Sequence, residues 1–375
     1  MSLGWVSFFT DVSSEMIAPF LPLFLSTTLG AGALALGLVE GIADAVSALL
    51  KLAAGRWSDR TGRFRPFVLL GYGLSSLARP FTALAAAPWH VVLVRGLDRV
   101  GKGVRTSPRD AMIAAVTREE HRGRAYGFQR AMDHAGSVVG PLLAIAIYLW
   151  ATRDLRTLFA LAAIPGAVAV AILFFGLREV PKPPDRSPLR LSGLPDRALV
   201  RLLVPIALFS LGNASDLFLL MRVVDEGSGP VEVALLWVGL HAVKSLVSIR
   251  AGPLVDRLGP LRLVIGGWVL YVAVYAGFAL ATSTTAIVGL CLVYGAYHGL
   301  TEGAEKALVA AIAPPAQRGA AFGWFHLTVG ILALPASLLF GAVWNAYGSS
   351  AAFLLGAALA ALACTALLAL RPGRG

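Results

Sequence analysis

The chain repeats one feature along almost its whole length: runs of about 20 or more mostly apolar residues, separated by short turns. A run of this length crosses the hydrocarbon core of a bilayer as a helix, which satisfies its own backbone hydrogen bonds there. The sequence predicts twelve spans, over residues 3–29, 34–54, 66–87, 89–115, 124–150, 156–177, 199–222, 231–250, 261–281, 284–312, 319–344 and 350–370.

Composition agrees with this pattern. Hydrophobic residues make up 57% of the chain and charged residues 14%, whereas soluble domains carry about 25% charged residues. These proportions exclude a soluble enzyme, a disordered regulator and a conventional nucleic-acid-binding protein. We therefore predict an all-α integral membrane protein that crosses the inner (plasma) membrane of the cell many times, without a nucleic-acid partner.

One connection differs from the short turns. Residues 178–198 combine five basic residues with five prolines, and such a segment cannot cross a membrane. It divides the predicted spans into six plus six. We therefore predict an N-terminal six-helix bundle over 1–177, a basic cytoplasmic linker over 178–198 and a C-terminal six-helix bundle over 199–375.

Lysine and arginine concentrate in alternate connections, after the second, fourth, sixth, eighth and last predicted spans. The positive-inside rule places such segments on the cytoplasmic side, so we predict that both termini are cytoplasmic. The net charge of +11 then reflects membrane topology. Two exceptions, Arg153 and Arg156, fall in a connection that this topology places outside.

The two predicted halves share three motifs in the same order, with offsets near 200 residues. The pairs are GRWSDRTG at 55–62 with GPLVDRLG at 252–259, RGRAYGF at 122–128 with RGAAFGW at 318–324, and Ser14-Glu15 with Ser215-Asp216. Parallel halves of six spans each are one known transporter build, in which the substrate site lies between the halves near mid-membrane.

These motifs resemble those of the major facilitator superfamily, and the resemblance covers the whole chain. Its signature after the second span is Gly-x-x-x-Asp-Arg-x-Gly-Arg. The matching residues are Gly55, Asp59, Arg60, Gly62 and Arg63, with Asp256 and Arg257 in the second half. The resemblance implies two pseudo-symmetric six-helix bundles. A carboxylate here can cap a neighbouring helix terminus in one conformation and release it in another, which makes the motif a candidate gate. The alternative is a solvated basic loop that serves topology only.

Two further family patterns match in part. The fourth-span pattern Arg-x-x-Gln-Gly-x-Gly retains its arginine as Arg95, to which the resemblance assigns helix packing. The fifth-span pattern of exporters, Gly-x-x-x-Gly-Pro, is matched by Gly136, Gly140 and Pro141, but the usual Gly-Gly does not follow. We assign these residues to helix packing as well, and the fifth-span match slightly favours export.

The fourth predicted span has the highest density of charged residues. At about 100° per residue, six ionic side chains fall within an arc of roughly 120°. They are Arg95, Asp98, Arg99, Lys102, Arg105 and Arg109. Such a stripe cannot face lipid, and its cations suit a carboxylate or phosphate. The alternative is that Arg105, Arg109 and Asp110 are solvated at the cytoplasmic end, while Asp98 neutralises Arg99 or Lys102. We predict substrate-binding roles for Arg99, Lys102, Arg105, Asn213 and His298.

The first predicted span carries Asp11 and Glu15 one helical turn apart. Two neighbouring carboxylates in a medium of low dielectric constant disfavour the doubly charged state, so the pair can take up and release a proton. We predict proton coupling by Asp11, Glu15, Asp98, Asp216 and Glu302. The alternatives are permanent pairing of Asp11 and Glu15 with the fourth-span cations, and a metal site.

The function predicted from these features is secondary active transport by alternating access. The expected partners are a small anionic or zwitterionic solute, protons or another coupling ion, and the lipid bilayer, and the expected protein is a monomer without a cofactor or resident metal. One alternative is a lipophilic drug/proton antiporter, which needs a larger apolar and aromatic cavity. The other is a metal or metal-chelate carrier that uses the acids of the first span with His298 and Glu302. An enzyme is not expected, because no nucleophile elbow, zinc-protease motif or phosphate-binding loop is present.

Overall fold

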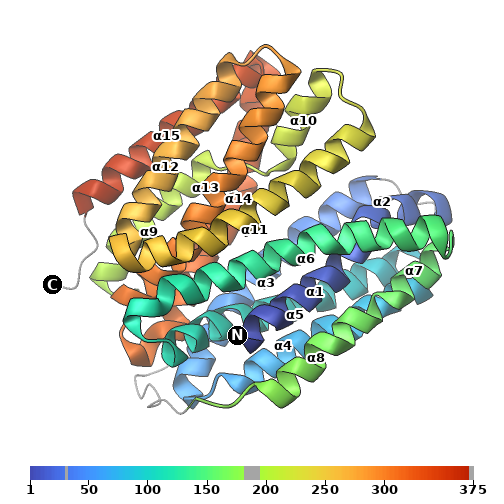
Figure 1. The fold of residues 1–375 in the computed structure, drawn as a ribbon, viewed down its shortest axis with the longest axis horizontal. Coiled ribbons are helices and arrows are strands. Elements are labelled where there is room, and N and C mark those ends of the chain that lie inside the picture. The colour runs from blue at the N-terminus through green and yellow to red at the C-terminus, as the bar shows by residue number, and fades with distance from the viewer. Residues whose placement is uncertain (30–32, 181–194, 371–375) are drawn as a thin grey trace. The chain divides into compact units, whose positions relative to one another are not determined.

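The structure is a computed structural model that describes residues 1–29, 33–180 and 195–370. Within these ranges every regular element is a helix (Figure 1). The contacts divide the chain into two compact units. Unit 1 comprises Met1–Val116, Met132–Pro188 and Pro315–Gly323, and unit 2 comprises Thr117–Ala131, Leu189–Pro314 and Trp324–Gly375.

Each unit takes most of one predicted half and a short segment of the other. Residues 117–131 belong to unit 2, and 315–323 belong to unit 1. The predicted boundaries 1–177, 178–198 and 199–375 stay a prediction. Residues 181–194 of the predicted linker lie outside the described part of the chain.

Unit 1 is built around long helices in which α3 and α4 pack on α5, and α1 and α4 pack on α8. Its α-helices are α1 (Ser2–Ile17), α2 (Leu21–Leu23), α3 (Ala33–Thr61), α4 (Arg65–Ala78), α5 (Pro88–Val116), most of α6 (Arg122–Trp150), α7 (Leu155–Leu161) and α8 (Ala163–Gly176). Its short helices are η1 (Ala18–Phe20), the π-helix η2 (Phe24–Thr28), η3 (Arg79–Leu84) and η5 (Pro315–Gln317).

Unit 2 contains α11 and α12 packed on α13, and α9 and α12 packed on α15. Its helices are α9 (Arg197–Gly212), α10 (Leu217–Asp225), α11 (Pro230–Leu258), α12 (Pro260–Leu280), α13 (Thr284–Ile312), most of α14 (Arg318–Tyr347) and α15 (Ser349–Leu370), with η4 (Glu119–His121) and the start of α6.

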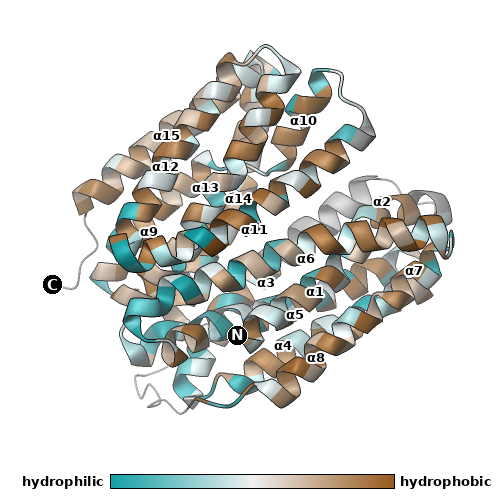
Figure 2. Ribbon diagram, in the orientation of Figure 1, coloured by the Kyte–Doolittle hydropathy of each residue, from teal (hydrophilic) through white to brown (hydrophobic). Residues whose placement is uncertain are grey.

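Eight helical segments of the described chain are long and apolar enough to cross a membrane. They are Arg65–Leu84, Glu119–Trp150, Leu155–Gly176, Arg197–Asp225, Glu232–Leu258, Pro260–Leu280, Pro315–Tyr347 and Ser349–Leu370. Figure 2 shows mostly brown and pale ribbon along α8 and α15, which carry no charged residue. The full count of twelve spans stays a prediction, because the helices over 3–29, 34–54, 89–115 and 284–312 are broken or carry more polar residues.

Besides the spans predicted over 66–87 and 156–177, which pass from α4 to η3 and from α7 to α8, two predicted spans are not single α-helices. The span predicted over 3–29 ends its α-helix at Ile17 and continues as short 3-10, α and π turns, with prolines at 19 and 22. The span predicted over 199–222 is interrupted after Gly212. Proline removes a backbone donor, which explains the first break. The second break carries the candidate site described below.

Glycines let the helices approach closely. A Cβ atom at Gly136 of α6 would lie 2.6 Å from the carbonyl oxygen of Phe8 in α1, and one at Gly140 would lie 2.7 Å from the Cβ of Glu15. The predicted packing residues Gly136 and Gly140 therefore lie where α6 meets the carboxylate-bearing helix α1. Small residues at such contacts are typical of transmembrane helix packing.

Gly136→Ala should lower the stability of unit 1, because its methyl group would overlap the α1 backbone. Overpacking of this kind costs about 1–3 kcal/mol. Gly73→Ala in α4 is the matched control, since a Cβ there meets nothing within 4 Å. Its expected effect is neutral or stabilising, because alanine favours helix over glycine. Thermal unfolding in detergent compares the two variants, and an equal unfolding temperature for both would contradict this packing account.

Candidate functional site

The first polar cluster lies beside a break between two helices. Residues 213–216 between α9 and α10 are not helical, so backbone groups lose their helix partners inside a predicted span. The Tyr271 hydroxyl donates to the carbonyl of Gly212 at 2.8 Å, and the amide of Ser215 donates to the Ser337 hydroxyl at 3.4 Å. Irregular backbone at membrane depth is tolerated where protein groups satisfy it in this way.

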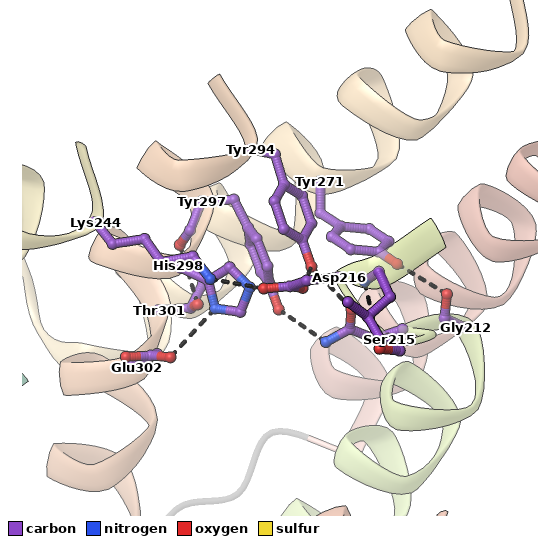
Figure 3. Close-up of polar contacts among 12 residues, drawn as sticks. Gly212, Ser215, Asp216, Lys244, Tyr271, Tyr294, Tyr297, His298, Thr301 and Glu302 are labelled. Carbon is purple, nitrogen blue, oxygen red and sulfur yellow. Dashed lines mark hydrogen bonds and ion pairs between the residues drawn. The ribbon is translucent and has the colours of Figure 1, made fainter. Parts of the chain in front are cut away.

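The break directs Asp216 toward α11 and α13 (Figure 3). Lys244 of α11 lies 2.8 Å from one of its carboxylate oxygens, and the Tyr294 hydroxyl donates to the other at 2.7 Å. Lys244 is only 3% exposed. A buried ammonium group needs a partner of opposite charge, and Asp216 supplies it.

His298 of α13 lies between two carboxylates. Its Nε2 is 3.8 Å from Asp216, and its Nδ1 is 3.2 Å from Glu302, one helical turn along α13. Glu302 also forms an ion pair with Arg130 at 3.4 Å. The result is a row in which cations and anions alternate, with a titratable imidazole at its centre. We call Asn213, Asp216, Lys244, Tyr294, His298 and Glu302 the Asp216 cluster.

Aromatic rings surround this cluster. The rings of Tyr294 and Tyr297 lie 4.9 and 4.7 Å from the imidazole of His298, and Tyr297 also receives a hydrogen bond from Asn213 at 3.5 Å. Behind them, the rings of Phe209 and Trp268 stack at 4.4 Å. These aromatic residues could not be recognised from the sequence, because tyrosine in an apolar helix carries no pattern that separates packing from function.

A second cluster lies in unit 1, on α5 and its neighbours. Arg79 forms a buried ion pair with Asp98 at 2.9 Å and donates to the carbonyl of Thr10 at 2.7 Å. The pair joins α5 to the end of α4 and to α1. Arg79 falls within the span predicted over 66–87, but spacing along one helix could not assign it a partner on another.

Arg105 stacks on the ring of Tyr72 at 4.0 Å. Its side chain is 5% exposed, and within the described ranges its Nε and Nη1 donors meet no hydrogen-bond acceptor. Arg109 donates to the Tyr72 hydroxyl at 3.3 Å and to Asp110 at 3.0 Å. The alternative in which Arg105, Arg109 and Asp110 are solvated is wrong here, because all three are buried. We call Tyr72, Arg79, Asp98, Arg105 and Arg109 the Arg105 cluster.

The acids of α1 lie close to the cations of α5. Asp11 and Glu15 are half-buried, and both interact electrostatically with Lys102, which is exposed. Asp11 also interacts with Arg105. Arg95 and Arg99 lie half-buried on the same helix, and Pro141 follows Gly140 within α6. The structure thus brings the predicted residues of the first and fourth spans together in unit 1.

The Asp-Arg motifs have matching geometry in the two units. Asp59, near the end of α3, accepts hydrogen bonds from the backbone amides of Gly319 and Ala320 at 2.9 and 2.6 Å, in the first turn of α14. Asp256, near the end of α11, accepts from Gly123 and Arg124 at 2.7 and 3.2 Å, in the first turn of α6. Each carboxylate thereby caps a helix that is distant in sequence.

The motif glycines terminate their helices. Gly62 and Gly259 have φ angles of 66° and 87°, in the left-handed region that glycine adopts without strain. Gly55 approaches so closely that a Cβ atom on it would lie 2.1 Å from the carbonyl oxygen of Gly319. Arg60, Arg63 and Arg257 are exposed.

The chain is similar in sequence to known proteins. Residues 3–304 match the family model of the Major Facilitator Superfamily. An uncharacterized MFS-type transporter of Methanocaldococcus jannaschii is 32% identical over 375 residues, covering 98% of this chain and 93% of that protein. The multidrug resistance protein MdtH of Yersinia pestis is 24% identical over 328 residues, covering 83% of this chain and 78% of that protein.

A solved structure shares the fold. The human organic anion transporter MFSD10 (TETRAN) superposes with a TM-score of 0.83, over 97% of this chain and 98% of that chain. The two sequences are 17% identical, so the likeness concerns the fold alone.

Asp59→Asn should loosen the first turn of α14, because an amide offers one acceptor oxygen where the carboxylate offers two. Loss of a capping interaction costs about 1 kcal/mol. Hydrogen exchange should accelerate at Gly319 and Ala320 by up to about tenfold and remain unchanged at Gly123 and Arg124. Asp256→Asn should show the reverse pattern, so each variant controls for the other. Equal protection of both helix starts in both variants would contradict the capping role.

Proposed function

Since the chain belongs to the Major Facilitator Superfamily, we propose that it is a secondary active transporter of a small anionic or zwitterionic solute, coupled to protons and working by alternating access. The proposal includes twelve spans, both termini in the cytoplasm, a plasma-membrane location and a monomeric protein. Export is slightly favoured, because the fifth-span motif of exporters is matched in part and the MdtH relative is named for multidrug resistance.

The observation that most supports an anionic substrate is that Arg105 is buried and that two of its donors meet no hydrogen-bond acceptor in the described chain. A buried donor without an acceptor loses its hydration and gains nothing in return, at about 1–3 kcal/mol and more for a charged group. Arg105 carries two such donors within the described chain, and its planar group is already oriented by Tyr72. A carboxylate or phosphate would satisfy these donors with charge-assisted hydrogen bonds. Lys102 lies one turn away on α5, is exposed, and extends the positive surface toward solvent.

The Asp216 cluster supports proton coupling. His298 has a carboxylate on either side, so a proton arriving on its imidazole is stabilised by Asp216 or Glu302 with small movements. Arg130 forms an ion pair with Glu302, and Lys244 forms one with Asp216. In this proposal Glu302 and His298 exchange the proton, Asp216 orients the imidazole, and Asp11 and Glu15 form a second acidic pair near the substrate cations.

Alternating access requires contacts that hold one conformation and release in another. The caps made by Asp59 and Asp256 are suited to this role, because a carboxylate at a helix N-terminus contributes only about 1 kcal/mol. Such contacts can break within a transport cycle. The exposed arginines of the motif are proposed to anchor these loops at the cytoplasmic membrane surface.

A second candidate function is lipophilic drug export. The aromatic shell around His298 favours it, since stacked rings beside an acidic centre suit a flat, apolar cation. The resemblance to MdtH agrees. A metal carrier has less support, because the described residues contain no group of three or more His, Cys, Asp or Glu side chains placed to hold an ion.

Thermal unfolding of the purified protein with a panel of organic anions, lipophilic cations and divalent metals tests the substrate class. We expect an organic anion to stabilise the protein, by about 2.7 kcal/mol at 100 times its dissociation constant. Arg105→Gln should abolish this stabilisation, whereas Arg60→Gln, at an exposed arginine, should retain it. Stabilisation by lipophilic cations alone, or by anions equally in Arg105→Gln, would overturn the anion proposal.

A further inference from the structure

Two arginines are left unused by the proposed function. Arg153 and Arg156 lie where α6 gives way to α7, in a connection that the proposed topology places on the outward side of the membrane. Cations are scarce in the other outward connections. A basic pair here runs against the positive-inside distribution and calls for a local physical reason.

The two side chains line a cavity of about 350 Å³ in unit 1. The cavity lies among the last turns of the broken first span, the end of α6 and the start of α7. Its apolar wall includes Leu23, Phe24 and Leu155, and Thr28 and Tyr148 add hydroxyl groups. The site therefore combines positive charge with apolar surface.

Arg156 is held in place. Its Nη1 donates to the carbonyl of Ala83 at 2.7 Å, and its guanidinium lies 5.3 Å from the ring centre of Phe24. Arg153 is exposed, with its guanidinium 5.9 Å from the ring centre of Tyr148. Among the described residues neither arginine forms an ion pair with a carboxylate within 4 Å, although Arg156 interacts electrostatically with Asp154.

The nearby carboxylate is engaged elsewhere. Asp154 lines the same cavity, but its oxygens accept hydrogen bonds from the Thr157 hydroxyl at 2.6 Å and from the amides of Thr157 and Arg156 at 3.0 and 3.2 Å. The hydrogen bonds from Thr157 lower the pKa of Asp154 below its usual value, so it remains ionised as the cap of α7. With two arginines and one aspartate, the cavity keeps an excess of positive charge.

We propose that this cavity binds a phosphate-bearing anionic group, with the headgroup of an anionic phospholipid as the source that its shape favours. Arg156 supplies a fixed cation and Arg153 a second cation that closes on the phosphate. Arginine recognises phosphate with charge-assisted hydrogen bonds. Basic pockets between transmembrane helices on the cytoplasmic or matrix side bind anionic headgroups, and the same charge complementarity would act in this cavity. Leu23, Phe24 and Leu155 would contact the glycerol and the first acyl carbons. That the lipid comes from the outward leaflet rests on the proposed topology. The binding of a phosphate group by the two arginines does not depend on that topology.

Native mass spectrometry of the purified full-length chain tests this proposal. The probes are phosphatidylglycerol and phosphatidylcholine with identical acyl chains. We expect preferential binding of phosphatidylglycerol, weakened about tenfold in Arg153→Gln by the loss of one charge-assisted contact. Arg153 is exposed, so the variant should fold. Arg201→Gln, at an exposed arginine of α9, is the matched control and should bind like the unmodified protein.

A competition experiment separates the two sources of phosphate. Glycerol 1-phosphate that displaces phosphatidylglycerol at millimolar concentration would indicate recognition of the lipid by its headgroup. Binding of glycerol phosphate in an Arg153-dependent manner, without preference for the lipid, would assign the site to a soluble phosphate. Equal binding of both lipids together with no effect of Arg153→Gln on any probe would overturn the proposal, while leaving the Arg105 test unaffected.

Discussion

The cost of charge inside a membrane governs this structure. An ionised side chain removed from water needs a counter-charge or a hydrogen-bond partner, because hydrocarbon offers neither. The chain meets this need by pairing charges from different helices. Asp98 pairs with Arg79, Asp216 with Lys244, and Glu302 with Arg130. These pairs join different helices. Arg105 differs from the other described arginines in that two of its buried donors, Nε and Nη1, meet no hydrogen-bond acceptor.

The same electrostatic principle operates at helix ends. The positive end of a helix dipole attracts a carboxylate, and in the described part of the chain three helix starts are capped by acids distant in sequence. Asp59 caps α14, Asp256 caps α6, and Glu179 accepts hydrogen bonds from Phe64 and Arg65 at the start of α4. The first two caps are equivalent under the internal repeat. The ion pairs therefore join helices within each unit, and the caps satisfy backbone donors where helices begin.

The family, the helical architecture and the polar helix faces could be predicted from the sequence, because hydropathy and helical spacing are local properties of the chain. Spacing on α5 predicted the cationic stripe, and repetition of the Asp-Arg motif predicted equivalent turns. The sequence could not predict which charged side chains on different helices pair with each other. No one-dimensional pattern links Arg79 to Asp98 or Lys244 to Asp216, and the break at 213–216 carries no proline and no run of glycines. Such a break is decided by tertiary hydrogen bonds, such as the one from Tyr271 to Gly212.

Proton movement driven by substrate is the most direct test of the account. The protein would be reconstituted into liposomes that enclose a pH-sensitive dye, and an organic anion that stabilises the purified protein would be added outside. We predict anion-dependent proton flux that is lost in Glu302→Gln, while anion stabilisation of that variant persists. Anion transport that ignores the pH gradient and is unchanged in Glu302→Gln would contradict the assignment of the Asp216 cluster to proton coupling.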